Sequence, residues 1–301
     1  MILFSCGGGN DKSNTKTVTE YELVPKDTMT KPEDGGYGFE NIAESMGFET
    51  YTFTEEDYKY FGHPDAQKGG NLKFTTSRFP ATFRVLGQHY NYTENYYIIG
   101  ALCYESLITT HPVTLEYIPA LASHWKLSED KMTFYFRIDP DARWSDGQEV
   151  TADDVVASYD IRMDETILFP STQVTYGKIQ RPEAVSKYII KVKSNTLNWR
   201  NMLYFGGMNI LPEHYLKDLD GTAYLEEYNF KLLPGTGPYV IKDEDIVNQE
   251  SYTVTRRDNW WREDHRTQKY MYNFDKVTIS VVKDNPALQF EKLKKGEADA
   301  I

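Results

Sequence analysis

Residues 138–159 read IDPDARWSDGQEVTADDVVASY, and this stretch decides the fold around it because it joins a strand, a turn and a helix. Just upstream, residues 133–138 alternate polar and apolar side chains, which predicts a strand with one buried face. Residues 145–147, Ser-Asp-Gly, predict a turn, since Asp can hydrogen-bond its own backbone and Gly accepts a positive φ. Nothing in the stretch indicates catalysis, and we interpret it as a scaffold.

A helix is expected after Thr151, which is a typical N-cap residue. Asp153 and Asp154 would place negative charge in the first turn, where unpaired N–H groups and the helix dipole favour it. An acid–base pair is the alternative, but adjacent helical residues point about 100° apart, and capping already accounts for both carboxylates. Apolar side chains then recur every four residues and predict one buried stripe: Val155, Tyr159 and Met163.

The opening stretch resembles a signature of the extracellular solute-binding proteins of ABC importers, in their oligopeptide- and dipeptide-binding family. The similarity lies in the pattern W-S-D-G-x-x-x-T-A-x-D-V-x-x-S-Y. Further blocks are similar to the same family in the same order: ALCYESL (101–107) with IPALASHW (118–125), LPGTGPY (233–239) and FEKLKKGEADA (290–300). The resemblance implies an α/β fold with mixed α+β lobes in a periplasmic-binding-protein-like two-lobe architecture, of which this chain is the truncated N-terminal portion.

The same resemblance divides the chain into parts. Residues 70–103 and 208–301 correspond to an incomplete first lobe, and residues 104–207 to a smaller domain inserted into it. Ahead of them we expect a lipoprotein signal remnant with its tether, residues 1–34, and a variable segment, residues 35–69. The other predicted strands are residues 71–75, 187–193, 239–242 and 277–281, and the other predicted helices are residues 98–107, 213–217 and 285–296.

The composition is that of a folded, acidic protein. A length of 301 residues suffices for about two domains, and 40% hydrophobic residues can bury a core. The 23 tyrosines suit surfaces that contact ligands through an apolar ring with a polar tip. The net charge of −12 argues against nucleic acid or an anionic membrane surface as partner, because both bind clustered Lys and Arg. No apolar run reaches the roughly 18 residues that a membrane span requires.

The two cysteines, Cys6 and Cys103, lie far apart, with no Cys-x-x-Cys and no His at zinc spacing. We therefore expect neither a disulfide framework nor a metal site. Cys103 lies in an apolar run and is predicted to be a small buried residue. Leu3-Phe4-Ser5-Cys6, followed by three glycines, resembles a bacterial lipobox, which implies a lipid anchor at Cys6 on a periplasmic or cell-surface protein. The alternative is an ordinary cysteine in a flexible N-terminus.

Residues 88–97, QHYNYTENYY, are too polar for a core. They form either a plain surface loop before the predicted helix 98–107 or part of a binding site, since binding groups concentrate on loops. In the family that the chain resembles, the segment before this helix faces the ligand cleft. The resemblance therefore implies these candidates for ligand contact: Tyr90, Tyr92, Glu94, Asn95 and Tyr96.

Residues 258–275, DNWWREDHRTQKYMYNFD, form a long segment rich in aromatic and charged side chains. It resembles an insertion in the subgroup of the microcin C binding protein, which also ends in Asn-Phe-Asp. The alternative is a surface loop pinned by its tryptophans, with Arg257, Arg262 and Arg266 in solvent. The nearby Gly235-Thr236-Gly237 lacks the third glycine of a dinucleotide-binding loop, and we interpret it as a tight turn between elements.

No motif for hydrolysis or phosphoryl transfer occurs, whether His-Glu-x-x-His, Gly-x-Ser-x-Gly, Ser-x-x-Lys or a Walker loop. The resemblance implies a monomeric, non-enzymatic component of an ABC importer that needs no cofactor. It would hold a peptide or peptide-like solute between two closing lobes and deliver it to permease and ATPase subunits, touching the membrane only through its lipid anchor. Two alternatives stay open: a two-lobe cleft hydrolase, and a periplasmic sensor or chaperone-type binding protein.

Overall fold

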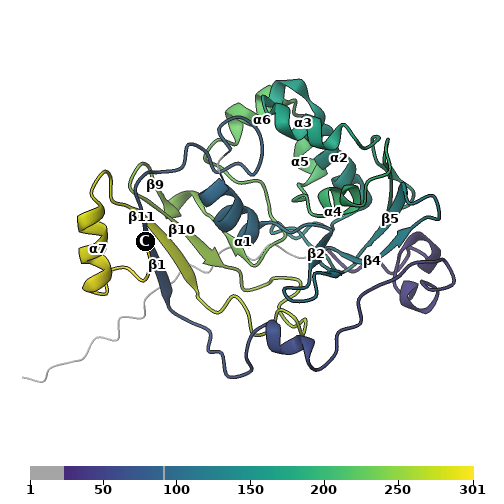
Figure 1. The fold of residues 1–301 in the computed structure, drawn as a ribbon, viewed down its shortest axis with the longest axis horizontal. Helices are drawn as coiled ribbons and strands as arrows, with labels where there is room; N and C mark the ends of the chain where they lie inside the picture. The colour runs from purple at the N-terminus through teal and green to yellow at the C-terminus, as the bar shows by residue number, and fades with distance from the viewer. Residues whose placement is uncertain (1–23, 91) are drawn as a thin grey trace, which may run out of the picture.

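The computed structural model describes residues 24–90 and 92–301, and the side chains of all of these except residues 92–94. Two β-sheets lie toward opposite sides of the molecule (Figure 1). The first sheet has the order β1-β11-β10-β8, with β9 paired to β10. Its strands are β1 (Asn71–Thr76), β8 (Tyr239–Val240), β9 (Ile246–Val247), β10 (Ser251–Arg256) and β11 (Lys276–Val281). β1 and β11 run parallel, and Leu72 pairs with Val277 and Phe74 with Ile279, so these apolar residues share one face.

The second sheet is antiparallel throughout, in the order β4-β5-β7-β6. Its strands are β4 (Ala122–Leu127), β5 (Thr133–Ile138), β6 (Glu183–Ala184) and β7 (Ile189–Lys193), and a hairpin of β2 (Ile108–Thr110) and β3 (Tyr117–Pro119) precedes them. One apolar core drawn from residues 107–210 packs against this sheet, and another, which includes Phe83, Ile99 and Tyr252, packs against the first. The predicted fold class of mixed α/β lobes is confirmed, and the predicted domain limits stay a prediction.

The prediction that β5 buries only one face is wrong. Arg137, on the supposedly solvated face, is 1% exposed because residues 35–48 fold over it (Figure 1, purple). Its guanidinium donates hydrogen bonds to the carbonyl oxygens of Gly35 at 2.8 Å and Gly36 at 3.1 Å. Gly35 has a φ of +86°, and an added Cβ would lie 2.9 Å from the Cβ of Tyr188, so only glycine fits this close approach.

Residues 24–34, which belong to the segment predicted as a tether, lie against the second sheet and the turn beside it. Asp27 pairs with Lys187 at 2.6 Å, and Lys26 pairs with Asp141 at 2.6 Å. The backbone N–H of Val24 donates to the carbonyl of residue 147 at 3.2 Å. Two ion pairs and a backbone hydrogen bond thus hold this segment, each contributing at most about 1 kcal/mol where it is exposed. Cys6 lies outside the described residues.

The helices are α1 (Ala101–Cys103), α2 (Ala152–Met163), α3 (Pro170–Tyr176), α4 (Arg200–Gly206), α5 (Glu213–Leu216), α6 (Gly221–Glu227) and α7 (Pro286–Lys294), with a π-helix at Tyr92–Gly100. The predicted N-cap at Thr151 is confirmed, because its N–H donates to the Asp154 carboxylate at 2.7 Å. The predicted helix over 98–107 is wrong: it ends at Cys103, since Glu105 donates its N–H to the Thr236 hydroxyl at 3.0 Å.

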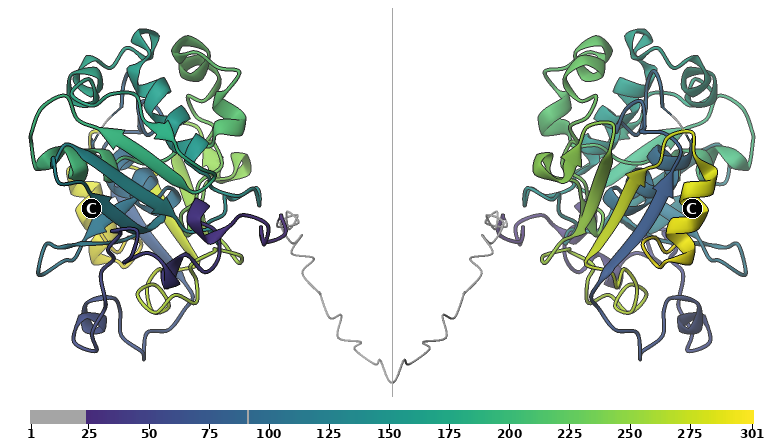
Figure 2. Two further views of the ribbon diagram at one scale, coloured as in Figure 1. Left: turned by 90° about the vertical axis from the view of Figure 1, so that its right-hand side faces the viewer. Right: turned by 90° about the vertical axis from the view of Figure 1, so that its left-hand side faces the viewer.

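α7 lies beside the edge strand β1 at one end of the molecule (Figures 1 and 2). Its predicted start is confirmed, since the Asn285 side chain accepts a hydrogen bond from the N–H of Leu288 at 3.0 Å. Its predicted apolar stripe is only partly covered, with Phe290 53% exposed. In the part of the chain that the structure describes, every helix is too short or too polar to cross a bilayer.

Gly235 and Gly237 lie so close to the backbone of α1 that neither position has room for a side chain. A Cβ on Gly235 would lie 1.9 Å from the carbonyl oxygen of Cys103, and one on Gly237 would lie 2.4 Å from that of Leu102. The N–H of Gly237 donates to the Cys103 carbonyl at 3.0 Å. Residues 235–237 therefore form a close backbone contact, which we call the seam, between α1 and the loop that leads into β8.

Candidate functional site

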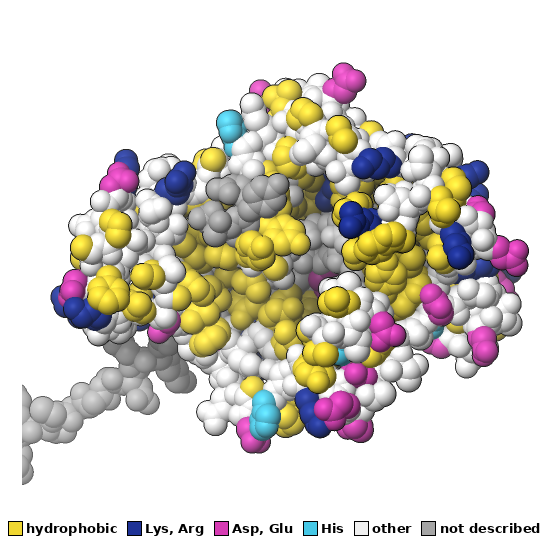
Figure 3. All heavy atoms as spheres, in the orientation of Figure 1, with side chains coloured by type: hydrophobic (Ala, Val, Ile, Leu, Met, Phe, Trp, Pro, Cys, Tyr) yellow, Lys and Arg dark blue, Asp and Glu magenta, His cyan; other side chains and the backbone are white. Residues whose placement is uncertain are grey.

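An apolar hollow opens at the end of the first sheet, on the face that carries Leu72 and Phe74. Figure 3 shows apolar side chains gathered over the region of α1 and this sheet. The hollow has a volume of about 340 Å³, enough for an amino-acid side chain. Its lining residues are Leu72, Phe74, Tyr97, Ile98, Leu102, Tyr239, Tyr272, Asn273, Phe274 and Val277.

The hollow is aromatic and carries no charged side chain: half of its lining residues are Phe or Tyr, and none is Lys, Arg, Asp, Glu, His or Cys. Such a surface binds through apolar contact and ring stacking, with the phenol groups and one amide available for hydrogen bonds. It offers no nucleophile paired with a base, which nucleophilic catalysis would need. Among the described residues, no group of three or more metal-ligating side chains gathers either.

The tyrosine-rich segment predicted from the sequence reaches this hollow only at its C-terminal end. Tyr96 and Tyr97 are 54% and 68% exposed, and their rings meet edge to face with centroids 5.0 Å apart. Tyr97 lines the hollow, whereas Tyr96 does not. Tyr90 is half-buried, with its ring 5.6 Å from that of Phe169. The side chains of Tyr92 and Glu94 lie outside the described ones.

Asn95, also predicted to contact ligand, is fully buried. Its side-chain amide donates hydrogen bonds to the carbonyl oxygens of Thr82 at 2.6 Å and Arg84 at 2.9 Å. A buried amide that bonds two backbone groups holds the chain in place. In this conformation Asn95 therefore braces the segment that carries the exposed tyrosines and does not face the hollow.

Sequence reasoning missed most of the hollow. Leu72, Phe74 and Val277 alternate as a core strand should, and nothing local distinguishes the half-exposed pair on β1 from fully buried neighbours. Tyr272 and Phe274 come from a segment more than 170 residues further along the chain than Tyr97. The one available signal was the density of tyrosines in residues 88–97, and it pointed to the correct edge of the hollow.

The segment 258–275 is held by buried charges beside the hollow. Glu105 accepts hydrogen bonds from the Trp261 indole at 2.8 Å and the Arg262 guanidinium at 3.2 Å. Burial raises the pKa of Glu105, which the nearby arginine opposes. Burial also lowers the pKa of Arg257 to about 10. The alternative of three solvated arginines is therefore wrong for Arg257 and Arg262, whereas Arg266 is exposed and pairs with a carboxylate.

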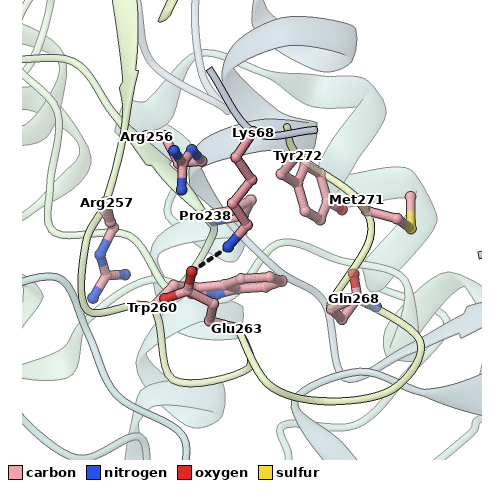
Figure 4. A pocket seen from close by; sticks show the side chains of 9 residues that line it. All are labelled: Lys68, Pro238, Arg256, Arg257, Trp260, Glu263, Gln268, Met271 and Tyr272. Carbon is pink, nitrogen blue, oxygen red and sulfur yellow. Dashed lines mark hydrogen bonds and ion pairs between the residues drawn. The ribbon is translucent and has the colours of Figure 1, made fainter. Parts of the chain in front are cut away.

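A second, smaller cavity is also lined by Tyr272, which belongs to the lining of the hollow as well (Figure 4). It has a volume of about 10 Å³, about that of one water-sized probe. Lys68 pairs with Glu263 above the plane of the Trp260 ring. The lining is Lys68, Pro238, Arg256, Arg257, Trp260, Glu263, Gln268, Met271 and Tyr272, and we call this cavity the polar well.

The hollow on the first sheet is open, aromatic and uncharged, which is the character of a ligand-binding surface. A family model described as bacterial extracellular solute-binding proteins, family 5 middle, matches residues 116–301. The chain belongs to this family, which confirms the resemblance seen in the signature stretch.

Relatives agree with this assignment. A putative binding protein of Brucella melitensis is 29% identical over 263 residues, which cover 81% of this chain and 40% of the relative. The probable peptide-binding protein YejA of Agrobacterium fabrum is 27% identical over 249 residues, with 81% and 39% coverage. The chain thus spans about two fifths of the length of these curated relatives.

Solved structures share the fold. The oligopeptide-binding protein AppA of Bacillus subtilis, in complex with a nonapeptide, superimposes with a TM-score of 0.64 at 24% identity, covering 78% of this chain and 44% of AppA. DppA of Helicobacter pylori, in complex with the peptide STSA, gives a TM-score of 0.57 at 22% identity, with coverage of 77% and 46%.

Proposed function

We propose that the chain is part of the substrate-binding component of an ABC importer and captures peptides or peptide-like solutes for a membrane permease. The observation that carries this proposal is the uncharged aromatic hollow, which opens beside the exposed pair Tyr96 and Tyr97. An open hollow of this kind holds apolar side chains without demanding one sequence, because stacking and apolar burial are tolerant of chemical detail. Family membership supports the transport role.

The names of similar proteins support peptides as the solute class. AppA is described with a nonapeptide, DppA with the peptide STSA, and YejA as a probable peptide-binding protein. The hydrolase and the sensor or chaperone gain no specific observation in their favour.

Within the site, we propose that Tyr90, Tyr92, Glu94 and Tyr96 contact the solute along its length and that Asn95 positions them from behind. The backbone of a peptide would pair with extended chain, while its side chains occupy the hollow and hydrated pockets nearby. The complete protein would act as a monomer outside the cytoplasm, with a lipid at Cys6 as its membrane anchor and with permease and ATPase subunits as partners.

The test is a titration with mixed tripeptides to nonapeptides, followed by native mass spectrometry. The 301-residue chain is compared with a version extended through the downstream reading frame. We expect bound peptide in both, with tighter binding in the extended version, because a second lobe would enclose the solute. Peptide cleavage during the incubation would support the hydrolase instead, and no retained peptide in either version would overturn the proposal.

A further inference from the structure

All five tryptophans of the chain lie among the described residues, and only Trp199 is exposed. It is the N-cap of α4 and is 71% exposed, whereas each of the other four is buried or half-buried. Leu197, two residues earlier, is 67% exposed, and Tyr204 on α4 is 41% exposed. Single exposed apolar residues are common, but a tryptophan with two further large side chains nearby in the chain indicates a surface for interaction.

Hydrogen bonds hold the segment around Trp199 in place. The side-chain amide of Asn201 donates to the carbonyl oxygen of Thr196 at 3.2 Å. The backbone N–H of Arg200 donates to the side-chain oxygen of Asn198 at 3.0 Å. A surface that is already ordered loses little conformational entropy when a partner covers it, which favours binding.

The side chain of Arg200 lies over the exposed indole, with its guanidinium carbon 5.1 Å from the centre of the Trp199 ring. A guanidinium stacked on an aromatic face keeps the N–H donors at its edge available for a carboxylate, which it can bind with two parallel hydrogen bonds. Trp, Tyr and Arg are the residues that most often carry the binding energy of protein interfaces. Trp199, Arg200 and Tyr204 bring all three together.

The charge of this region is positive. Residues 170–207 contain six Lys or Arg and one acidic residue, although the whole chain has a net charge of −12. Three of the six form ion pairs, whereas Lys178 and Arg200 form none with the described residues. Lys178 lies beside the exposed segment, because its carbonyl accepts the N–H of Asn195 at 2.8 Å. Figure 3 shows Lys and Arg side chains next to apolar ones over the region of α4.

We propose that Leu197, Trp199, Arg200, Tyr204 and Lys178, which we call the Trp199 surface, dock a protein partner through a segment that combines carboxylates with an apolar side chain. The apolar side chain would cover the indole, and the carboxylates would pair with the two free cations. Two cations are too few to hold a chain of this net charge on nucleic acid or an anionic bilayer. None of the five residues lines the hollow, so the surface is separate from the proposed solute site.

The fluorescence of Trp199, taken as the difference between the wild type and Trp199→Phe, reports docking directly. The probes are a copolymer of glutamate and tyrosine, poly-glutamate, and vesicles of phosphatidylglycerol. We expect the copolymer to shift the emission to shorter wavelength and to shield the indole from acrylamide, and poly-glutamate to do so less, because it lacks apolar side chains. In calorimetry, Trp199→Ala and Arg200→Glu should each weaken copolymer binding by about tenfold.

Arg78→Glu makes the same change of charge at another exposed residue, and this matched control should bind the copolymer as the wild type does. Wild-type affinity in both Trp199→Ala and Arg200→Glu would overturn the proposal. Tighter binding to the vesicles than to the copolymer would overturn it in favour of a membrane surface. A Trp199 emission that is already shifted in the extended version without any probe would also overturn it, since another part of the protein would then cover the surface.

Tyr97→Ala separates this surface from the solute site, because Tyr97 lines the hollow. The copolymer should shift the Trp199 emission in this variant as it does in the wild type. Loss of the shift in Tyr97→Ala would mean that the copolymer binds in the hollow, which would overturn the docking surface and leave the peptide-binding function standing. Conversely, failure to retain peptides in the previous experiment would leave the test of the Trp199 surface unaffected.

Discussion

The Ser158 side chain in the middle of α2 holds the backbone of Leu211: the Leu211 N–H donates to Ser158 Oγ at 2.7 Å. Asp154 and Arg162, which lie one helical turn before and after Ser158, also hydrogen-bond the backbone of residues 209–213, at every second residue. The Asp154 carboxylate accepts from the N–H of Glu213 at 2.7 Å, and the Arg162 guanidinium donates to a carbonyl at residue 209 at 2.6 Å. One face of α2 thus acts as a ladder that joins the part carrying the second sheet to the part carrying the hollow.

Ser158→Ala removes the central rung of this ladder. Ser158 and Leu211 are both fully buried, so in this variant the Leu211 N–H would lose its acceptor and no water could replace it. We expect the free energy of unfolding to fall by about 1–3 kcal/mol, as measured by urea denaturation. Ser171→Ala on α3, where the side chain is exposed, is the control and should change the value little. A loss no larger than that of the control would mean that the rung does not stabilise the fold.

Asp154 is expected to make stability depend on pH in the acid range. Burial raises the pKa of Asp154 from 3.8 to about 6, in spite of the N–H donors of Glu213 and Thr151. The folded state then binds a proton more tightly than the unfolded chain, so this contribution is complete below pH 3.8 and is lost as the pH rises through about 6.

The free energy of unfolding of the wild type minus that of Asp154→Asn should therefore fall between about pH 4 and pH 6 and level off above it. Denaturant titrations at several pH values measure this difference. Asp153→Asn removes an exposed charge at the same end of the helix and controls for net charge. A difference that rises with pH over this range would contradict the raised pKa.

His214 is expected to make stability depend on pH above the range in which Asp154 titrates. Its Nε2 lies 2.8 Å from the Asp146 carboxylate, and this hydrogen bond raises the pKa of His214 above 6.5. The contribution of the pair to stability is complete below pH 6.5 and is lost as the pH rises through the folded-state value. We expect His214→Gln to lose this part of the pH dependence and to keep the part due to Asp154. An unchanged profile between neutral and mildly alkaline pH would exclude the pairing.

Gly235→Ala tests the seam between α1 and β8. The added Cβ would lie 1.9 Å from the Cys103 carbonyl oxygen, so the backbone must move apart, and we expect a loss of about 3 kcal/mol in unfolding free energy. Gly70→Ala is the matched control, because its Cβ meets nothing within 4 Å and only its φ of +82° is unfavourable. The control should lose about 1 kcal/mol. Equal losses in both variants would argue against a close backbone contact at residue 235.

Local patterns predicted the strand, turn and capped helix of residues 133–163 because those elements depend on neighbours in sequence. They failed where distant segments decide burial. Arg137 lies in the alternation at a position expected to face solvent, and it is buried only because residues 35–48 fold over it. The same applies to Arg262, whose partner Glu105 lies more than 150 residues away.

The candidate site shows the same limit. The tyrosine-rich segment was visible by composition, and its last residue, Tyr97, does line the hollow. Asn95 was indistinguishable from its polar neighbours until the carbonyl groups that it bonds were in place. The other walls come from Ile98 and Leu102, from β1, from Tyr239 and from residues 272–277, which come together only when the first sheet forms.

The most direct test of the central claim, that the aromatic hollow binds solute, is peptide affinity measured by calorimetry in variants of exposed lining residues. Tyr97→Ala and Phe274→Ala truncate rings that are 68% and 41% exposed, so the fold should tolerate both changes. We expect each to weaken binding of a phenylalanine-containing peptide by about tenfold. Tyr60→Ala, an exposed tyrosine outside the lining, should bind as the wild type does. Wild-type affinity in both hollow variants would contradict the account.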